Sequence, residues 1–181
     1  MIWILATAGW GFAEATLFFI VPDVLLTYVV LKFGLRKALN LSAVAAAAAV
    51  LGGIVMWLWS AADAEAARRA MLMVPAVDPD LLARAGREMA GFWPLDLVVG
   101  AVTGMPYKLY AVEAGARDIN LLAFAAMSFA ARFIRFALAA GLTAVAREGL
   151  ERLRQARWST TVWAAGWLLL YAVYFTIRAM A

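Results

Sequence analysis

The stretch Phe12–Gly34, "FAEATLFFIVPDVLLTYVVLKFG", decides how the chain folds. It is apolar enough to enter a lipid bilayer, yet it carries two carboxylates, Glu14 and Asp23, and places Pro22 beside the second. A spanning helix needs about 20 apolar residues, so the apolar run Met1–Leu31 is too long for one pass and too short for two. The run therefore predicts a helix that enters part way, breaks near Pro22 and returns as a re-entrant hairpin.

The composition predicts an integral membrane protein. Hydrophobic residues make up 66% of the 181 residues and charged residues only 15%, whereas a soluble domain is usually about half apolar. The length leaves room for one compact membrane domain without an added soluble catalytic domain. We therefore expect a multi-pass membrane protein.

The missing residue types and the positive charge narrow the function further. Cysteine and histidine are absent, which excludes disulfides, thiolate or imidazole metal sites and Ser-His or Cys-His nucleophile pairs in this chain. We expect no resident metal or cofactor and no enzyme, so that proton chemistry falls to carboxylates. The net charge is +4. The basic residues lie mostly beside apolar runs, which predicts contact with anionic lipid headgroups rather than with nucleic acid.

A second apolar stretch repeats the features of the first. Phe92–Gly115, "FWPLDLVVGAVTGMPYKLYAVEAG", carries charged residues and places Gly104 just before Pro106, which predicts a second broken hairpin. Pro22 and Pro106 are each followed by a Gly-X-Arg turn and a long apolar helix. If both hairpins return to their side of entry, the two long helices cross in opposite senses, as in inverted-repeat transporters.

The whole chain is predicted to be an all-α membrane domain in which two broken re-entrant hairpins form an inverted repeat packed with spanning helices. Its parts are the first hairpin with its spanning helix (1–62), a polar interfacial loop (63–91), the second hairpin with an arginine-bearing helix (92–146), a basic loop (147–157) and a final span (158–178). Within the polar loop we expect a short helix with Asp78 as N-cap and Pro79 at its first position. Aromatic residues such as Trp93, Trp158 and Tyr174 are expected to anchor the chain at the membrane interface.

Ionisable side chains occur at predicted membrane depth. They are Glu14, Asp23, Asp96, Lys108, Glu113, Arg132 and Arg135. Each costs about 2.5–3.5 kcal/mol near a helix centre when ionised and unpaired, so these groups must pair, become neutral or line water. We expect Asp96, Glu113 and Lys108 to reach toward the interface. Backbone breaks at membrane depth are tolerated only beside a cavity or inside protein, so the hairpin tips imply a cavity.

Arg132 and Arg135 leave two interpretations open. They are three residues apart, share a helix face and can present two guanidinium groups to one anion. With Lys108 they would form a phosphate cradle. Alternatively, they only neutralise Glu14 and Asp23 in a structural ion-pair network.

The same residues resemble a known family. "FAEATLFFIVPDVLL" resembles the first hairpin of the DedA/VTT-domain (SNARE-associated) membrane proteins, and "TGMPYKLYAVEAG" followed by "FAAMSFAARFIRFALAAGL" resembles the second hairpin and arginine-bearing helix of one branch. The match covers most of Phe12–Leu142. The resemblance implies a lipid translocase that moves undecaprenyl phosphate or phospholipids, often coupled to the proton gradient.

Together with this resemblance, the sequence predicts a flippase or scramblase for a phosphate-bearing lipid in a bacterial-type inner (plasma) membrane. Arg132, Arg135 and Lys108 are expected to bind the anionic headgroup, and Glu14 and Asp23 to exchange protons. The hairpin tips, Pro22, Gly104 and Pro106, are expected to form the gate. The partners would be membrane lipids and protons, with oligomer formation left open. A structural membrane protein is the main alternative, and a membrane enzyme with a carboxylate-bound metal is a third that the spacing of the carboxylates does not favour.

Overall fold

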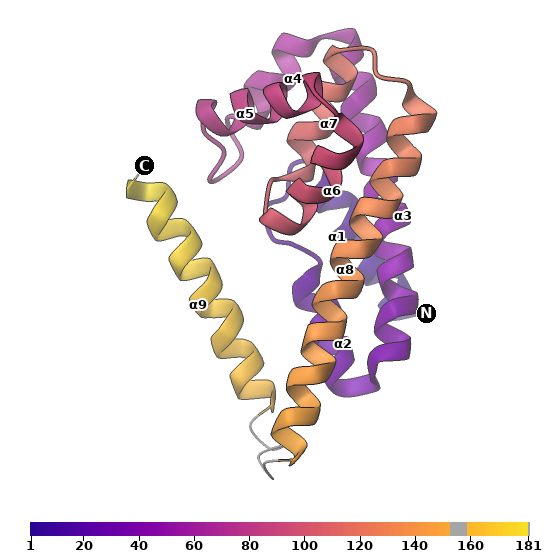
Figure 1. Cartoon of the computed structure of the whole chain (residues 1–181), viewed down its shortest axis with the longest axis vertical. Coiled ribbons are helices and arrows are strands. Elements are labelled where there is room, and N and C mark those ends of the chain that lie inside the picture. The colour runs from indigo at the N-terminus through magenta and orange to yellow at the C-terminus, as the bar shows by residue number, and fades with distance from the viewer. Residues whose placement is uncertain (153–158, 181) are drawn as a thin grey trace.

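The computed structural model describes residues 1–152 and 159–180, and over these ranges the chain is α-helical without strands, which confirms the all-α class. The helices are α1 (Ile2–Ala15), α2 (Asp23–Phe33), α3 (Leu35–Ala62), α4 (Ala64–Met71), α5 (Pro79–Ala90), α6 (Trp93–Thr103), α7 (Tyr107–Ala116), α8 (Leu121–Arg152) and α9 (Ser159–Met180) (Figure 1). Trp158 and residues 153–157 of the predicted basic loop lie outside the described residues.

Two long helices form the scaffold of the fold. Helices α3 and α8 pack against each other and run in opposite directions (Figure 1). By length and composition, α3 and residues Leu121–Glu151 of α8 are each apolar and long enough to cross a membrane. At 1.5 Å per residue, the 28 residues of α3 extend about 42 Å.

A unit of two short helices with a break between them precedes each long helix. In the first unit, α1 ends at Ala15, and α2 begins after Pro22, which occupies the N-cap position. The chain turns back here, because the ring of Trp3 near the start of α1 lies 5.3 Å from the ring of Phe33 at the end of α2, in an edge-to-face contact. The predicted break at Pro22 therefore separates two antiparallel helices.

The second unit has the same plan. Helix α6 ends before Gly104, which adopts the left-handed conformation with φ 92°, and α7 begins after Pro106. Glycine enters this conformation without the steric cost that a side chain would add. The Tyr110 hydroxyl on α7 donates to the Asp96 carbonyl near the start of α6 at 3.2 Å, so α7 returns along α6. All residues of α7 from Tyr107 to Gly115 are buried, and this helix forms the centre of the bundle.

The polar segment 63–91 folds into two helices rather than a loop. Asp78 caps α5 by accepting a hydrogen bond from the Leu81 amide at 2.7 Å, and Pro79 occupies the first turn. This prediction is confirmed. Helices α4 and α5 lie at the upper end of the bundle in Figure 1, where Met71, Leu81 and Met89 join the buried core. Apolar positions on one face of each helix explain why the segment packs onto the bundle.

Helix α8 extends further than the sequence pattern indicated. It continues to Arg152, into the segment predicted as a basic loop from residue 147. The extension contains no proline, and Arg147 pairs with Glu151 one turn later at 2.7 Å. Good helix formers and an i,i+4 ion pair favour continued helix here.

The contact between α1 and α3 depends on glycine, and we expect Gly11→Ala to lower the free energy of unfolding by about 1–3 kcal/mol. A Cβ atom at Gly11 would lie 2.6 Å from the Ala45 carbonyl oxygen, and two packed backbones cannot easily separate. The matched control is Gly9→Ala on the same helix, where a Cβ atom meets nothing within 4 Å. Thermal and denaturant unfolding of both variants should show loss only for Gly11→Ala, and equal stability of the two would contradict the close packing.

Candidate functional site

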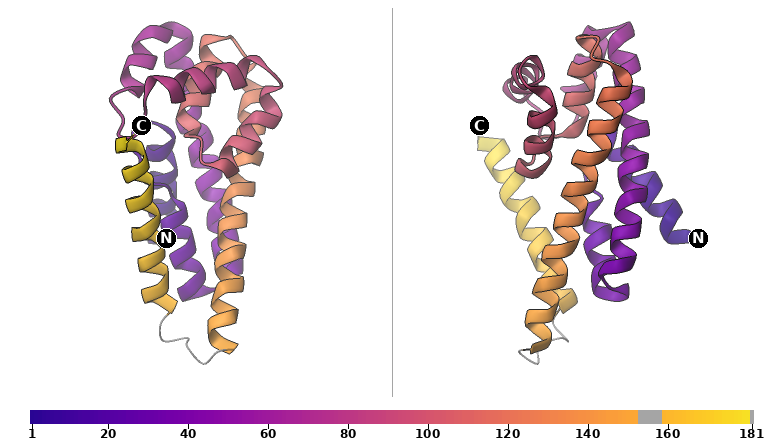
Figure 2. Two further views of the ribbon diagram at one scale, coloured as in Figure 1. Left: turned by 60° about the vertical axis from the view of Figure 1, so that its left-hand side comes forward. Right: turned by 45° about the vertical axis from the view of Figure 1, so that its right-hand side comes forward.

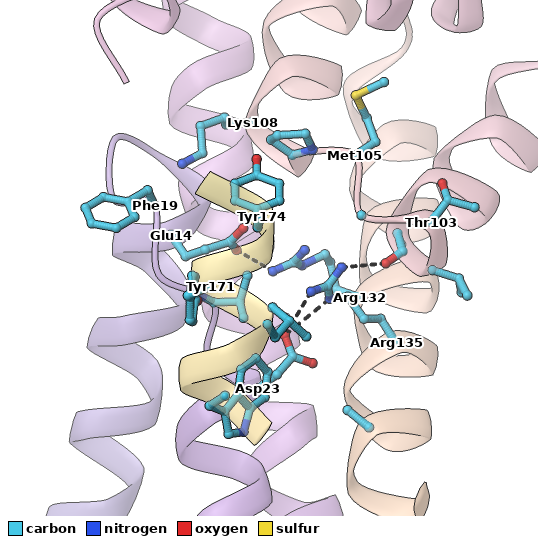
Figure 3. Close-up of a pocket in the computed structure, with 18 of the residues that line it drawn as sticks. Glu14, Phe19, Asp23, Thr103, Met105, Lys108, Arg132, Arg135, Tyr171 and Tyr174 are labelled. Atoms are coloured by element: carbon cyan, nitrogen blue, oxygen red, sulfur yellow. Dashed lines mark hydrogen bonds and ion pairs between the residues drawn. The ribbon is translucent and has the colours of Figure 1, made fainter. Parts of the chain in front are cut away.

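A cavity of about 570 Å³ lies where both helix breaks meet the middle of α8, and α9 contributes to its lining (Figure 3). Its polar lining residues are Glu14, Asp23, Thr103, Lys108, Arg132, Arg135, Tyr171 and Tyr174. Gly104 and Pro106 line it as well, and Pro22 lies between the lining residues Val21 and Asp23. The structure therefore brings the predicted site residues together at one place.

Arg132 and Glu14 form a fully buried ion pair at the centre of the cavity wall. Arg132 is 1% exposed and Glu14 is 4% exposed, and Nη2 of the arginine donates to Oε2 of the glutamate. The guanidinium carbon lies 4.7 Å from the centre of the Phe136 ring and 5.3 Å from that of Tyr107, in the range of cation–π contacts. Among the described residues the buried Nε atom of Arg132 has no hydrogen-bond partner, so this cation retains a free donor.

Arg135 connects the two helix-break-helix units. Its Nε and Nη2 atoms both donate to Oδ2 of Asp23, each at 3.2 Å. Its Nη1 atom donates to the carbonyl of Ala101 at 2.7 Å, in the last turn of α6, where carbonyl groups lack a partner within the helix. One side chain thus holds the start of α2 next to the end of α6 (Figure 3).

Lys108 makes a second connection between the units. Its ammonium group donates to the Phe18 carbonyl in the first break, and the side chain is buried. We expected this lysine to reach out to the interface, but it points inward (Figure 3). The reason is local, because a carbonyl in a helix break has no backbone donor of its own and offers a strong acceptor.

Helix α9 supplies aromatic groups that sequence reasoning missed. The Tyr171 hydroxyl accepts a hydrogen bond from the Val21 amide at 3.0 Å. The indole groups of Trp163 and Trp167 both donate to the Thr27 hydroxyl, at 2.9 and 3.0 Å. The signal in the sequence is the i,i+4 spacing of positions 163, 167 and 171, which places these rings on one helix face.

Tyr174 was expected to anchor the chain at a membrane interface, but it lines the cavity. It lies three residues after Tyr171 and hence on the same side of α9. The aromatic face of α9 therefore lines the cavity with Trp167, Tyr171 and Tyr174.

The charges of the cavity favour an anion. Three cationic side chains and two carboxylates line it, which leaves a formal excess of one positive charge. Helix α7 begins at the cavity, and the first amide groups of a helix carry partial positive charge without intrahelical acceptors. A phosphate or another anion would balance this excess of positive charge.

Glu113 belongs to a separate ion cluster. Nε and Nη2 of Arg68 donate to its carboxylate at 2.6 and 2.9 Å, and Arg117 donates to it as well. Arg117 also donates to the Gly86 carbonyl at 2.9 Å, so the cluster ties α4, α5 and α7 together. The hydrogen bond from Arg68 to Glu113 raises the pKa of the Arg68 guanidinium. We expected Glu113 to reach toward an interface, but it is buried between two arginines and does not line the cavity.

The remaining observations concern metal ions and known proteins. Within residues 1–152 and 159–180, no group of three carboxylates is arranged to hold a metal ion. The chain matches no protein-family model, and comparison with curated proteins and with solved structures gives no match.

Proposed function

We propose that the protein is an integral membrane lipid translocase, a flippase or scramblase, which moves a phosphate-bearing lipid such as undecaprenyl phosphate or a phospholipid across a bacterial-type inner membrane. The observation that carries the proposal is the cationic cavity at the meeting point of two helix breaks. It combines a buried arginine, Arg132, and a partly buried one, Arg135, with an excess of positive charge. Membrane-buried charges commonly mark the path of a substrate.

The distribution of side chains supports a membrane environment. Large apolar residues are exposed along the outer surfaces of α1, α3, α8 and α9, for example Ile2, Leu5, Leu51, Leu58, Leu122 and Leu168. The interior instead contains the charged groups of Glu14, Asp23, Lys108, Glu113 and Arg132. A soluble protein has the opposite preference. Hydrocarbon around the bundle accounts for both observations.

The lengths of the helices support re-entrant hairpins. Helices α1, α2, α6 and α7 contain 14, 11, 11 and 10 residues. A helix needs about 20 residues to cross a bilayer, so each of these helices is too short to do so alone. Both breaks lie at the cavity, where irregular backbone is tolerated inside a bilayer. The motifs around Pro22 and Pro106 are also those that resemble the hairpins of DedA/VTT-domain proteins.

The ion pairs suggest how transport proceeds. A phosphate group entering the cavity competes with Glu14 and Asp23 for Arg132, Arg135 and Lys108, because it offers several strong acceptor atoms. A buried carboxylate that loses its cation is stable mainly when protonated. Headgroup binding would therefore take up protons at Glu14 and Asp23, and the hairpin tips at Pro22, Gly104 and Pro106 would gate access.

One observation favours a second candidate, a structural membrane protein whose charges form a packing network. Each arginine in the cavity already pairs with a carboxylate, Arg132 with Glu14 and Arg135 with Asp23. A network of this kind could serve only to hold the two helix-break-helix units against α8. The charge of Lys108, which exceeds the two carboxylates and two arginines that line the cavity, favours the transport function over this alternative.

Reconstitution in liposomes tests the proposal. Labelled undecaprenyl phosphate and labelled phosphatidylethanolamine are placed in one leaflet, and their movement is followed with and without a pH gradient. We expect protein-dependent movement of at least one of the two lipids. Acceleration of this movement by the pH gradient would indicate a coupled flippase, and independence of the gradient would indicate a scramblase. Movement of neither lipid would contradict the proposal and favour the packing network.

A further inference from the structure

The charged cavity continues into a second cavity of about 350 Å³ between α8 and α9. The two cavities share the lining residues Ala139, Leu142, Trp167 and Leu170. We call this second cavity the α8–α9 slot. Its other lining residues are Thr27, Leu31, Thr143, Ala146, Arg147, Leu150, Val162, Trp163 and Gly166. The two cavities therefore adjoin, so that one molecule can occupy both.

The slot exists because α9 is fixed to the first helix-break-helix unit instead of to α8. Thr27 on α2 accepts hydrogen bonds from two indoles of α9, and the ring of Tyr28 lies 5.4 Å from that of Trp163. Farther along, Tyr171 binds the Val21 amide. These contacts hold α9 so that it diverges from α8 toward its C-terminus (Figures 1 and 2). Small residues at positions 139, 146 and 166 line the slot between the two helices.

The surface of the slot is suited to hydrocarbon. Most of its lining side chains are apolar, and the polar ones have partners inside the protein. Thr143 donates to the Ala139 carbonyl at 2.8 Å, and Thr27 donates to the Asp23 carbonyl at 2.6 Å. Arg147 donates to Glu151 and, at 3.2 Å, to the Val30 carbonyl. A mostly apolar cavity with few unpaired polar groups has little to offer water and favours an apolar occupant.

The slot also opens outward. Leu142, which belongs to both cavities, is 71% exposed, so a long chain can continue past it into the surroundings of the bundle. The volume of about 350 Å³ falls in the range of about 300–1,000 Å³ that is usual for ligand sites. Together the two cavities present a charged end and an apolar end to one amphiphilic molecule.

We propose that the α8–α9 slot binds a hydrocarbon chain of the lipid whose anionic headgroup occupies the charged cavity. The inference rests on the proposed function for the identity of the headgroup and adds the site of the tail. It limits the substrate to amphiphiles with at least one long chain, because a free phosphate ion would leave the slot empty. Gly166, Ala139 and Leu142 then determine which chains fit.

Chain-directed photolabelling tests the slot independently of transport. The probe is phosphatidic acid with a diazirine in one acyl chain, presented to the full-length protein in phosphatidylcholine vesicles. Labelled residues are expected on the facing sides of α8 and α9 around positions 139, 142 and 166. Labelling confined to the outer surface of α1 and α3, or to a contact with a second copy of the chain, would overturn the inference.

Gly166→Phe should fill the slot. A Cβ atom at Gly166 meets nothing within 4 Å, so the ring can enter the slot without displacing backbone, and we expect chain labelling to fall about tenfold, as for a loss of roughly 1.4 kcal/mol in binding. Gly141→Phe is the matched control, because Gly141 has the same free space on α8 but lines neither cavity. Unchanged labelling in Gly166→Phe would overturn the inference.

Transport measured on the same variants separates the two proposals. If the wild-type protein moves no lipid but its slot is labelled, the translocase proposal fails and the tail site stands. If the wild-type protein moves lipid and Gly166→Phe moves it equally well, the tail site fails and the translocase stands. Melting temperatures of both variants show whether either substitution disturbs folding.

Discussion

Glu14→Gln is expected to lower the free energy of unfolding by about 3–5 kcal/mol, because it leaves the buried guanidinium of Arg132 without its counter-charge. The carboxylate is the one ion-pair partner of Arg132 within the described residues, and both side chains are shielded from solvent. Chemical denaturation in detergent, followed by circular dichroism, measures the change. The amide of glutamine keeps the size of the side chain, so the effect reports the charge.

Glu65→Gln provides the control for this substitution. Glu65 also pairs with an arginine, Arg69, but both side chains are largely exposed, and exposed pairs contribute little to stability. We expect its unfolding transition to coincide closely with that of the wild type. An equally small effect of Glu14→Gln would show that the Glu14–Arg132 contact is not an ionised pair.

Arg135→Gln is expected to slow lipid movement about 10–100-fold with a smaller loss of stability than Glu14→Gln. Arg135 is the more accessible of the two cavity arginines, with 20% of its side chain exposed, so water can partly compensate Asp23 after the substitution. A charge-assisted hydrogen bond contributes about 1.5–3 kcal/mol, and each 1.4 kcal/mol corresponds to a tenfold change. Leaflet exchange of labelled undecaprenyl phosphate in liposomes measures the loss.

Two companion variants define what Arg135 contributes. Arg135→Lys keeps the charge but loses the planar fork, so an intermediate rate is expected. Arg69→Gln removes an exposed arginine outside the cavity and should leave the rate unchanged. Equal rates for Arg135→Gln and the wild type would remove Arg135 from the site.

Features set by local backbone chemistry could be predicted from the sequence. Proline removes a backbone donor and glycine permits the left-handed conformation, so the sequence predicts the helix breaks near Pro22 and at Gly104–Pro106. The cap of α5 by Asp78 followed for the same reason. The shared face of Arg132 and Arg135 follows from helical periodicity alone, and both residues do line one cavity.

Features that depend on packing between distant segments could not be predicted. The pairing of Arg132 with Glu14 joins positions 118 residues apart, and the sequence offered pairing with the carboxylates only as one of two alternatives. Snorkelling is the expectation for Lys108 and Glu113 because both lie in an apolar stretch, but a carbonyl in the first break holds Lys108 inside the bundle, and Arg68 on α4 does the same for Glu113. The role of Tyr171 depends on where α9 packs.

Lipid movement by the charge-neutral double variant Glu14→Met/Arg132→Met tests the central claim most directly. Replacing a buried ion pair with apolar side chains of similar volume is often neutral or stabilising, so this variant should regain most of the stability that Glu14→Gln loses. If the buried charges serve transport, the refolded variant in liposomes moves undecaprenyl phosphate no faster than protein-free vesicles do. A stable double variant that moves the lipid at the wild-type rate would contradict the account and show that the pair serves packing alone.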